Sequence, residues 1–162
     1  MKRVALLIFC FMVGFVFCFF KIIVVRSESM SDTLRDGSIT IALRVNGLNR
    51  NAVAINRGDI VIVSRGRDAN IIKRVVGVEG DNIEILDYGQ SVLLNGQPLS
   101  EPYIRRVLFK PGEKDPFQKP ARKVQPSHVF LLGDNRREST DSRDFGDIDM
   151  QSIVGKVICC AR

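Results

Sequence analysis

Two serines and one lysine are the residues of this chain whose types fit nucleophilic catalysis. Ser27 and Ser29 flank a glutamate in the stretch RSESMSDTL, which follows a long apolar run near the N-terminus. The chain has a single histidine, His128, at the edge of the apolar stretch HVFLL. This excludes a metal site built on several histidines and disfavours a Ser-His-Asp site, so a serine nucleophile here would need a different base.

The stretch IIKRVVGVEGD offers such a base. Side chains alternate faces along a strand, so Lys73 and Arg74 point in opposite directions, with Ile71 and Val75 beside the lysine. One of the two cations must share a face with β-branched apolar residues. A lysine there loses hydration, and lowering its pKa from about 10.4 to about 8 yields a usable general base. The alternative is an edge strand whose two cations both reach water.

A third polar segment, LLGDNRRESTDSRDFGDI, covers residues 131–148. Its hydrogen-bonding residues follow one another closely after an apolar start: Gly133, Asp134, Asn135, Ser139, Asp141, Ser142 and Arg143. They fit a polar turn whose side chains satisfy the local backbone. They also fit a set of groups that orient a catalytic side chain, and the residues alone leave both interpretations open.

Short apolar runs rich in Ile and Val, bounded by Gly, Asp, Asn or Pro, must position these groups. They predict strands at residues 38–43, 59–64, 71–78, 82–86, 91–94, 128–132 and 153–159. Asn95-Gly96 has the chemistry of a two-residue hairpin turn, because both positions tolerate a positive φ. We therefore predict a mainly β, antiparallel domain, with residues 105–125, which hold three prolines and many charges, as an exposed loop.

The N-terminal segment predicts a membrane anchor. Residues 4–20 carry no polar side chain, and a helix over residues 4–25 would rise about 33 Å, enough to cross a hydrocarbon core of about 30 Å. Lys2 and Arg3 place the N-terminus in the cytoplasm. We expect residues 1–25 to form the anchor and 26–162 an extracytoplasmic domain. A cleavable signal peptide, cut near Ser27 and Ser29, is the competing interpretation, but its apolar stretch is usually shorter.

Charge and cysteine content argue against nucleic-acid binding, a cysteine zinc site and a disulfide between neighbouring cysteines. The net charge is +6, but the first 26 residues hold four basic side chains and no acidic one, while the remaining 20 basic residues face 18 acidic ones. The chain beyond the anchor therefore lacks the basic excess that nucleic-acid binding needs. None of the cysteine pairs has zinc-ligand spacing, and the adjacent Cys159 and Cys160 cannot easily form a relaxed disulfide.

Four segments together resemble a known family. SESMSDTL, RGDIVIV, IIKRVVGVEGD and LLGDNRRESTDSRDFG resemble, in order and approximate spacing, the sequence boxes of bacterial type I signal peptidases. These are membrane-bound serine peptidases that remove signal peptides from exported proteins. The resemblance implies that Ser29, which precedes a methionine, is the nucleophile, that Lys73 is its base, and that Ser27 is the side-chain oxyanion donor.

The same resemblance assigns supporting roles in the third segment and in the apolar pockets. Ser139 matches the serine that hydrogen-bonds the lysine, and Asp141 and Arg143 match a supporting ion pair. The turn packed beside the site corresponds to Gly133, Asp134 and Asn135. The pockets for small residues at the first and third positions before the cut correspond to Met30, Leu34, Ile62 and Ile72.

The resemblance implies an acyl-enzyme peptidase that needs no metal or cofactor. Its partners would be signal peptides of exported preproteins, membrane lipid and, as a candidate, the export machinery, in the bacterial cytoplasmic membrane. Arg26 and Asp32 depart from the family, which usually has proline at both positions. The alternatives are a specialised peptidase of the same clan that matures pilins or conjugation proteins, and a catalytically silent, membrane-tethered β module.

Overall fold

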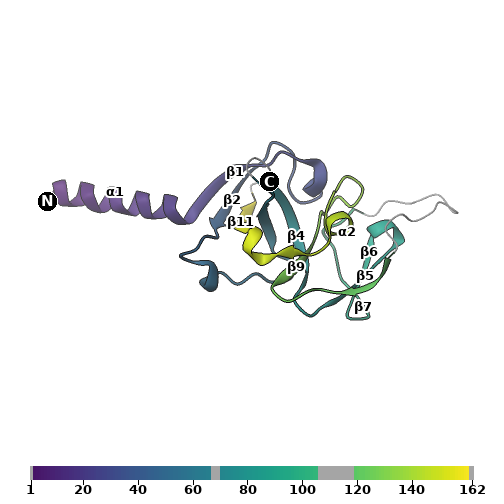
Figure 1. Ribbon diagram of the computed structural model, residues 1–162. Coiled ribbons are helices and arrows are strands. Elements are labelled where there is room, and N and C mark those ends of the chain that lie inside the picture. The colour runs from purple at the N-terminus through teal and green to yellow at the C-terminus, as the bar shows by residue number, and fades with distance from the viewer. Residues whose placement is uncertain (1, 67–69, 106–118, 161–162) are drawn as a thin grey trace.

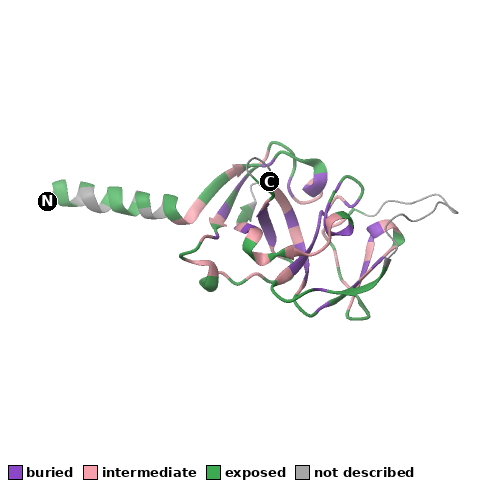
Figure 2. Ribbon diagram, viewed as in Figure 1, coloured by how far each residue is buried: buried purple, intermediate pink, exposed green. Residues whose placement is uncertain are grey.

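The computed structural model describes residues 2–66, 70–105 and 119–160, and it consists of one helix and a body of two antiparallel β-sheets. The helix, α1 (Lys2–Phe19), projects away from the sheets (Figure 1). Except for the half-buried Phe19, its residues are exposed wherever their burial is described, while the buried residues gather in the sheets (Figure 2). The mainly β, antiparallel prediction is confirmed.

The larger sheet has seven strands in the order β1-β2-β11-β3-β4-β9-β10, and all neighbours are antiparallel. Its strands in chain order are β1 (Phe20–Val24), β2 (Ile39–Arg44), β3 (Ile60–Ser64), β4 (Asn70–Val78), β9 (His128–Leu132), β10 (Ile148–Asp149) and β11 (Ile153–Cys160). The chain reaches this sheet early, leaves it after β4, and returns with β9. Segments far apart in sequence therefore lie side by side along β4.

The smaller sheet has the order β7-β6-β5-β8. Its strands are β5 (Asn82–Leu86), β6 (Ser91–Leu94), β7 (Gln97–Pro98) and β8 (Lys119–Lys123). Asn95 and Gly96 connect β6 to β7 with φ of 54° and 80°, which confirms the predicted hairpin turn. Short helical turns complete the body: η1 (Glu28–Met30), η2 (Arg50–Ala52), η3 (Asp87–Gly89), α2 (Ser142–Phe145) and η4 (Met150–Ser152).

Strand β4 contributes to two apolar clusters. Val75 packs into the cluster of the larger sheet with Val61 and Leu131, while its neighbour Val76 packs with Phe130 and residues of the smaller sheet. This follows from the alternation of side chains along a strand. A third cluster holds the segment after β1 against the sheet through Val25, Met30, Leu34 and Ile60.

The expected helix over residues 4–25 is wrong at its C-terminal end. Helix α1 ends at Phe19, and Phe20–Val24 forms β1, which pairs with β2 over five residue positions. The β-branched residues Ile22, Ile23 and Val24 favour a strand, and β2 offers an open edge with which they pair.

Among the residues described, no helix is both long and apolar enough to span a membrane.

The expected loop over residues 105–125 is also wrong in part. Lys119–Lys123 forms β8, which pairs with β5, and Val124 is buried at 1% exposure in the cluster between the sheets. The charged side chains of KPARK suggested a solvated loop. They also fit a strand, because an antiparallel sheet can face solvent on one side. Residues 106–118 of the predicted loop lie outside the described residues.

Candidate active site

The segment after β1 holds Ser29 in a fixed turn. The Ser27 hydroxyl accepts a hydrogen bond from the Ser29 amide at 3.1 Å and so caps η1, and the two hydroxyls lie 3.0 Å apart. Met30 and Leu34, both at 1% exposure, pack against Val25 and anchor the turn from below. Ser29 is thereby presented next to β4 with 4% of its surface exposed.

Lys73 meets Ser29 from β4. Its amine lies 2.6 Å from Ser29 Oγ and donates a second hydrogen bond to the Ile72 carbonyl at 3.2 Å. The lysine is only 3% exposed and sits opposite Val61 in the sheet. Burial lowers the pKa of Lys73, and the positive charge of Arg143 lowers it further, while Asp141 and Asp134 oppose the shift. A lysine that releases its proton readily therefore faces a serine hydroxyl.

The Gly133-Asp134-Asn135 turn holds the segment that follows β1 and carries Ser29, called the serine segment below. The Asn135 amide donates to the Ser29 carbonyl at 3.1 Å, and its side-chain amide donates to the Glu28 carbonyl and the Ser31 hydroxyl, each at 3.1 Å. A Cβ at Gly133 would lie 2.5 Å from the Ser29 carbonyl oxygen. Glycine is therefore required here by space, because any side chain would push into the serine segment.

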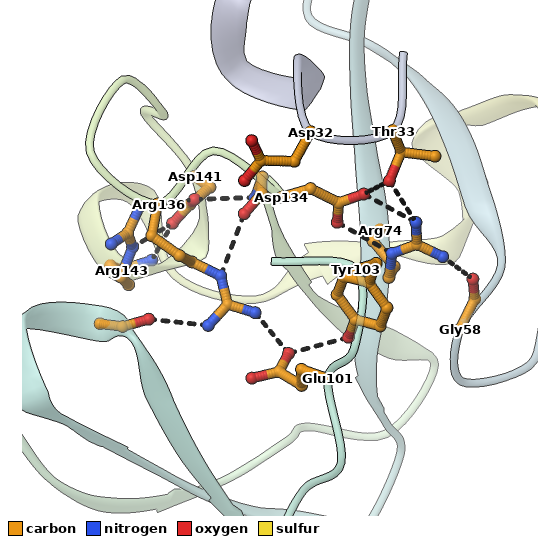
Figure 3. Close-up of polar contacts among 12 residues, drawn as sticks. Asp32, Thr33, Gly58, Arg74, Glu101, Tyr103, Asp134, Arg136, Asp141 and Arg143 are labelled. Atoms are coloured by element: carbon orange, nitrogen blue, oxygen red, sulfur yellow. Dashed lines mark hydrogen bonds and ion pairs between the residues drawn. The ribbon is translucent and has the colours of Figure 1, made fainter. Parts of the chain in front are cut away.

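Arg74 extends this grip from β4 (Figure 3). Its guanidinium binds both oxygens of Asp134, at 2.8 and 2.7 Å, and also donates to the Gly58 carbonyl at 2.8 Å. Thr33, in the serine segment, donates its hydroxyl to the same carboxylate. The side chains of Arg74 and Asp134 are 11% and 1% exposed. Of the two adjacent basic residues, Lys73 thus contacts Ser29, and Arg74 forms an ion pair with Asp134.

A second buried ion pair lies behind the turn. Arg143 contacts both Asp141 oxygens, at 2.8 and 2.9 Å, and Asp141 also accepts from the Gly133 amide at 3.0 Å. Asp141 caps α2 as well, which fixes its orientation. The predicted pairing of these two residues is therefore present, and it ties α2 to the Gly133 turn.

Ser139 lies over Gly133 and is 7% exposed. Its hydroxyl has no hydrogen-bond partner among the described residues, so the expected hydrogen bond to Lys73 is not made in this structure. Its role at the site stays a prediction.

The sequence did not indicate Arg136, a buried arginine that braces the same turn (Figure 3). It donates to the Gly133 carbonyl at 3.0 Å and the Gly89 carbonyl at 2.7 Å, and it forms an ion pair with the buried Glu101. The Tyr103 hydroxyl donates to the same carboxylate at 2.8 Å. The one sequence signal was the position of Arg136 directly after the Gly-Asp-Asn turn.

Asp32 has a defined contact. Its carboxylate accepts from the Arg105 backbone amide at 2.8 Å, and the Arg105 guanidinium lies 3.9 Å away. Asp32, one of the two residues that depart from the expected prolines, therefore connects the serine segment to Arg105.

A cavity of about 280 Å³ opens beside Ser29 and Lys73. Its described walls come from the end of β1, the serine segment, β3 and β4: Ile23, Val24, Val25, Arg26, Ser27, Ser29, Met30, Ile62, Asn70, Ile71, Ile72 and Lys73. Of the predicted pocket residues, Met30, Ile62 and Ile72 line it, whereas Leu34 belongs to the apolar cluster beneath. The β1 residues were missed because that stretch was assigned to the helix.

His128 lies at the start of β9, with its Nδ1 2.7 Å from the Pro126 carbonyl oxygen. Within the described part of the chain, no group of three or more His, Cys, Asp or Glu residues is arranged to hold a metal ion. The lysine is thus the basic group that this structure brings to a serine.

An antiparallel β body with a buried lysine amine against a serine hydroxyl defines a candidate hydrolase site of the serine-lysine kind. The chain belongs to the signal peptidase family, peptidase S26, whose family model matches residues 1–161. The resemblance found in the sequence is therefore confirmed.

Relatives of this chain carry the same family name. It is 36% identical over 144 residues to signal peptidase IB of Staphylococcus aureus (strain N315), covering 82% of this chain and 73% of the relative. It is 36% identical over 142 residues to signal peptidase I of Bacillus caldolyticus, covering 83% and 75%. The crystal structure of a signal peptidase I from Enterococcus faecalis V583 is similar, with a TM-score of 0.53 and 29% identity over 66% of this chain and 98% of that one.

Proposed function

We propose that this chain is a membrane-anchored serine endopeptidase that removes N-terminal signal peptides from exported preproteins, with Ser29 as nucleophile and Lys73 as general base. The contact of 2.6 Å between the buried Lys73 amine and Ser29 Oγ carries this proposal. Membership of the signal peptidase family supports the substrate class.

The reaction passes through an acyl-enzyme. Neutral Lys73 takes the proton of Ser29 as Oγ attacks the carbonyl carbon of the scissile bond, and then delivers this proton to the departing amine. A water molecule, activated by the same lysine, next attacks the ester and releases the signal peptide as a carboxylic acid. The lowered pKa of Lys73 favours the first step, because more of the amine is free to accept a proton.

Ser27 and the Ser29 amide are the proposed oxyanion donors. In this structure the Ser29 amide donates to the Ser27 hydroxyl, whose oxygen lies 3.0 Å from Ser29 Oγ. Both groups therefore sit beside the attacking oxygen. On substrate binding, each exchanges its present acceptor for the carbonyl oxygen as negative charge develops there.

The remaining predicted residues act by positioning. Asp134 and Asn135 hold the serine segment, and Asp141 and Arg143 hold the Gly133 turn through buried hydrogen bonds. Ser139, which packs against Gly133 and whose hydroxyl has no partner among the described residues, is the proposed hydrogen-bond partner of the lysine. Substrate residues with small side chains fit the cavity wall formed by Met30, Ile62 and Ile72, with Leu34 supporting Met30 from below.

Two surfaces support a location at the bacterial cytoplasmic membrane, with the domain on the outer side. Helix α1 exposes Phe9, Phe11 and Phe17 at 63–75%, which favours an apolar environment around it. Its 18 residues rise about 27 Å, which is less than a hydrocarbon core of about 30 Å and agrees with the finding that no described helix is long and apolar enough to span one. The sheet continues this apolar surface with five side chains of β1, β2 and β11, each at least 38% exposed: Ile22, Val24, Ile39, Ile41 and Ile158.

This location places enzyme and substrate in one bilayer, which raises their effective concentration. Because α1 ends at Phe19, the folded body begins with β1, a few residues before the division at 25 and 26 expected from sequence. The export machinery, which delivers the preprotein to the same membrane, is a candidate partner.

The test is cleavage of a preprotein with an Ala-x-Ala site by the full chain in detergent. Wild type is expected to cleave, while Ser29→Ala and Lys73→Ala, checked for an unchanged melting temperature, are expected to lose at least about 10³-fold in rate. Cleavage by Ser29→Ala at the wild-type rate would refute the nucleophile assignment. An inactive wild type would favour the catalytically silent module, and cleavage confined to pilin-like substrates would favour the specialised peptidase.

A further inference from the structure

The wall of the cavity beside Ser29 carries an exposed arginine, Arg26. The inference that follows rests on the proposed function, because it concerns the peptide that would occupy this cavity. The described walls are otherwise apolar, apart from Ser27, Ser29, Asn70 and Lys73. No carboxylate belongs to the lining that the structure describes, so the charged side chains there are both basic.

The two basic residues differ in character. Lys73 is buried against Ser29, and its lowered pKa favours a neutral amine. The guanidinium of Arg26 is exposed and carries a positive charge. Among the described lining residues, Arg26 is therefore the charged group available to an occupant of the cavity.

Among the described residues, none pairs with Arg26. The structure gives its side chain no hydrogen bond or ion pair to any residue in the described ranges. The acid nearest in sequence, Glu28, is exposed and does not line the cavity. Arg74 and Arg143, by contrast, each form an ion pair with a buried carboxylate. Arg26 is thus left for an external anion.

The position of Arg26 determines which part of a substrate it would meet. Arg26 directly precedes Ser27, whose hydroxyl is 3.0 Å from Ser29 Oγ, and the preceding β1 residues line the same wall. An extended peptide advances about 3.3 Å per residue, so the four residues before the cut span about 13 Å of this wall. Because side chains alternate, the second and fourth residues before the cut point away from pockets that take the first and third.

We propose that Arg26 is a specificity-determining residue that favours preproteins with an aspartate or glutamate at the second, fourth or fifth position before the cleavage site. A carboxylate there meets the guanidinium at the cavity wall, whereas a lysine meets a like charge. The family's usual proline offers neither interaction, so this preference distinguishes the present chain from relatives that keep the proline.

The experiment compares peptides that are identical except for Glu, Gln or Lys at one of the positions two, four and five before the cut. With wild type in detergent at low salt, we expect the best Glu peptide to have a kcat/KM about two- to fivefold above its Gln counterpart, and the Lys peptide to be lower still. Added salt is expected to compress these differences, because screening weakens an exposed ion pair.

Arg26→Glu is expected to invert the order, and Arg26→Pro to remove it. Arg35→Glu is the control, because it makes the same charge change at an exposed arginine outside the cavity lining. This variant is expected to keep the wild-type order.

Equal rates for the three peptides at every position with wild type would overturn the inference. So would an inversion by Arg35→Glu of the same size as that by Arg26→Glu, because the effect would then reflect net charge. These results leave the proposed function intact, since the peptides are still cleaved. Failure of wild type to cleave any peptide would overturn both.

Discussion

Replacing Gly133 by alanine tests the tightest contact of the proposed site. The added Cβ would lie 2.5 Å from the Ser29 carbonyl oxygen and 2.5 Å from Ser139 Cβ. Carbon-oxygen contacts in proteins are comfortable at about 3.3–3.6 Å, so one side must move by about 1 Å. The Gly133 turn is held on both sides, by Asp141 at its amide and Arg136 at its carbonyl. The serine segment therefore moves.

A shift of this size has a predictable cost. Moving Ser29 by about 1 Å breaks its alignment with the Lys73 amine, which now lies 2.6 Å away, and a misplacement of that size costs on the order of 10²-fold in rate. Overpacking is expected to lower the free energy of unfolding by about 1–3 kcal/mol. The assay is kcat/KM for a preprotein peptide, with denaturant unfolding measured in parallel.

Gly47→Ala is the matched control, because a Cβ at Gly47 meets no atom within 4 Å. It is expected to leave both measurements unchanged. The double variant Gly133→Ala, Ser139→Gly removes the clash with Ser139 and keeps the clash with the Ser29 backbone, so it is expected to stay impaired. If Gly133→Ala alone keeps kcat/KM within threefold of wild type, the spatial argument is refuted.

Three further predictions concern charge. The kcat/KM of wild type is expected to rise with pH through the lowered pKa of Lys73, and so to reach its plateau below the ordinary lysine value of 10.5; a plateau only above 10.5 would contradict this. Lys73→Met is expected to be inactive yet more stable by urea unfolding at neutral pH; because the unfolded chain holds the lysine proton more tightly, this gain should shrink as pH rises toward 10.5, and a constant gain would speak against it. Asp134→Ala, which removes the carboxylate partner of Arg74, is expected to cost about 3–5 kcal/mol, whereas Lys156→Ala, at a more exposed pair, should cost at most about 1 kcal/mol, and equal losses would refute the role of burial.

Seven strands, β2 to β6, β9 and β11, were predictable because each is a short apolar run between turn-forming residues. Strand β1 was not, because Phe20–Val24 continues the apolar run of α1 without a boundary residue. Its strand conformation depends on pairing with β2, nearly 20 residues later, which the local sequence does not record. Strand β8 was also not predicted, because its charged residues fit a solvated loop equally well.

The candidate site was predictable in its chemistry and less so in its supports. Alternation along β4 indicated that Lys73 and Arg74 would point in opposite directions, but not that Lys73 would be buried at 3% exposure or that Arg74 would pair with Asp134. The contact between Arg136 and Glu101 joins residues 35 apart, and neither carries a local signal of the other. Patterns along the chain indicate which groups can react, whereas the residues that hold those groups in place are identified only from the folded structure.

The grip of Asn135 on Glu28 has a consequence for when the enzyme becomes active. The two residues are 107 positions apart in sequence, and Lys73 is 44 positions from Ser29. Contacts of such long range form late, because loop closure opposes them until most of the chain is ordered. A chain released after β4 would hold serine and lysine without the turn that aligns them. Under the proposed function, peptidase activity is therefore expected to appear only after the part of the chain that follows β4 has folded against the serine segment.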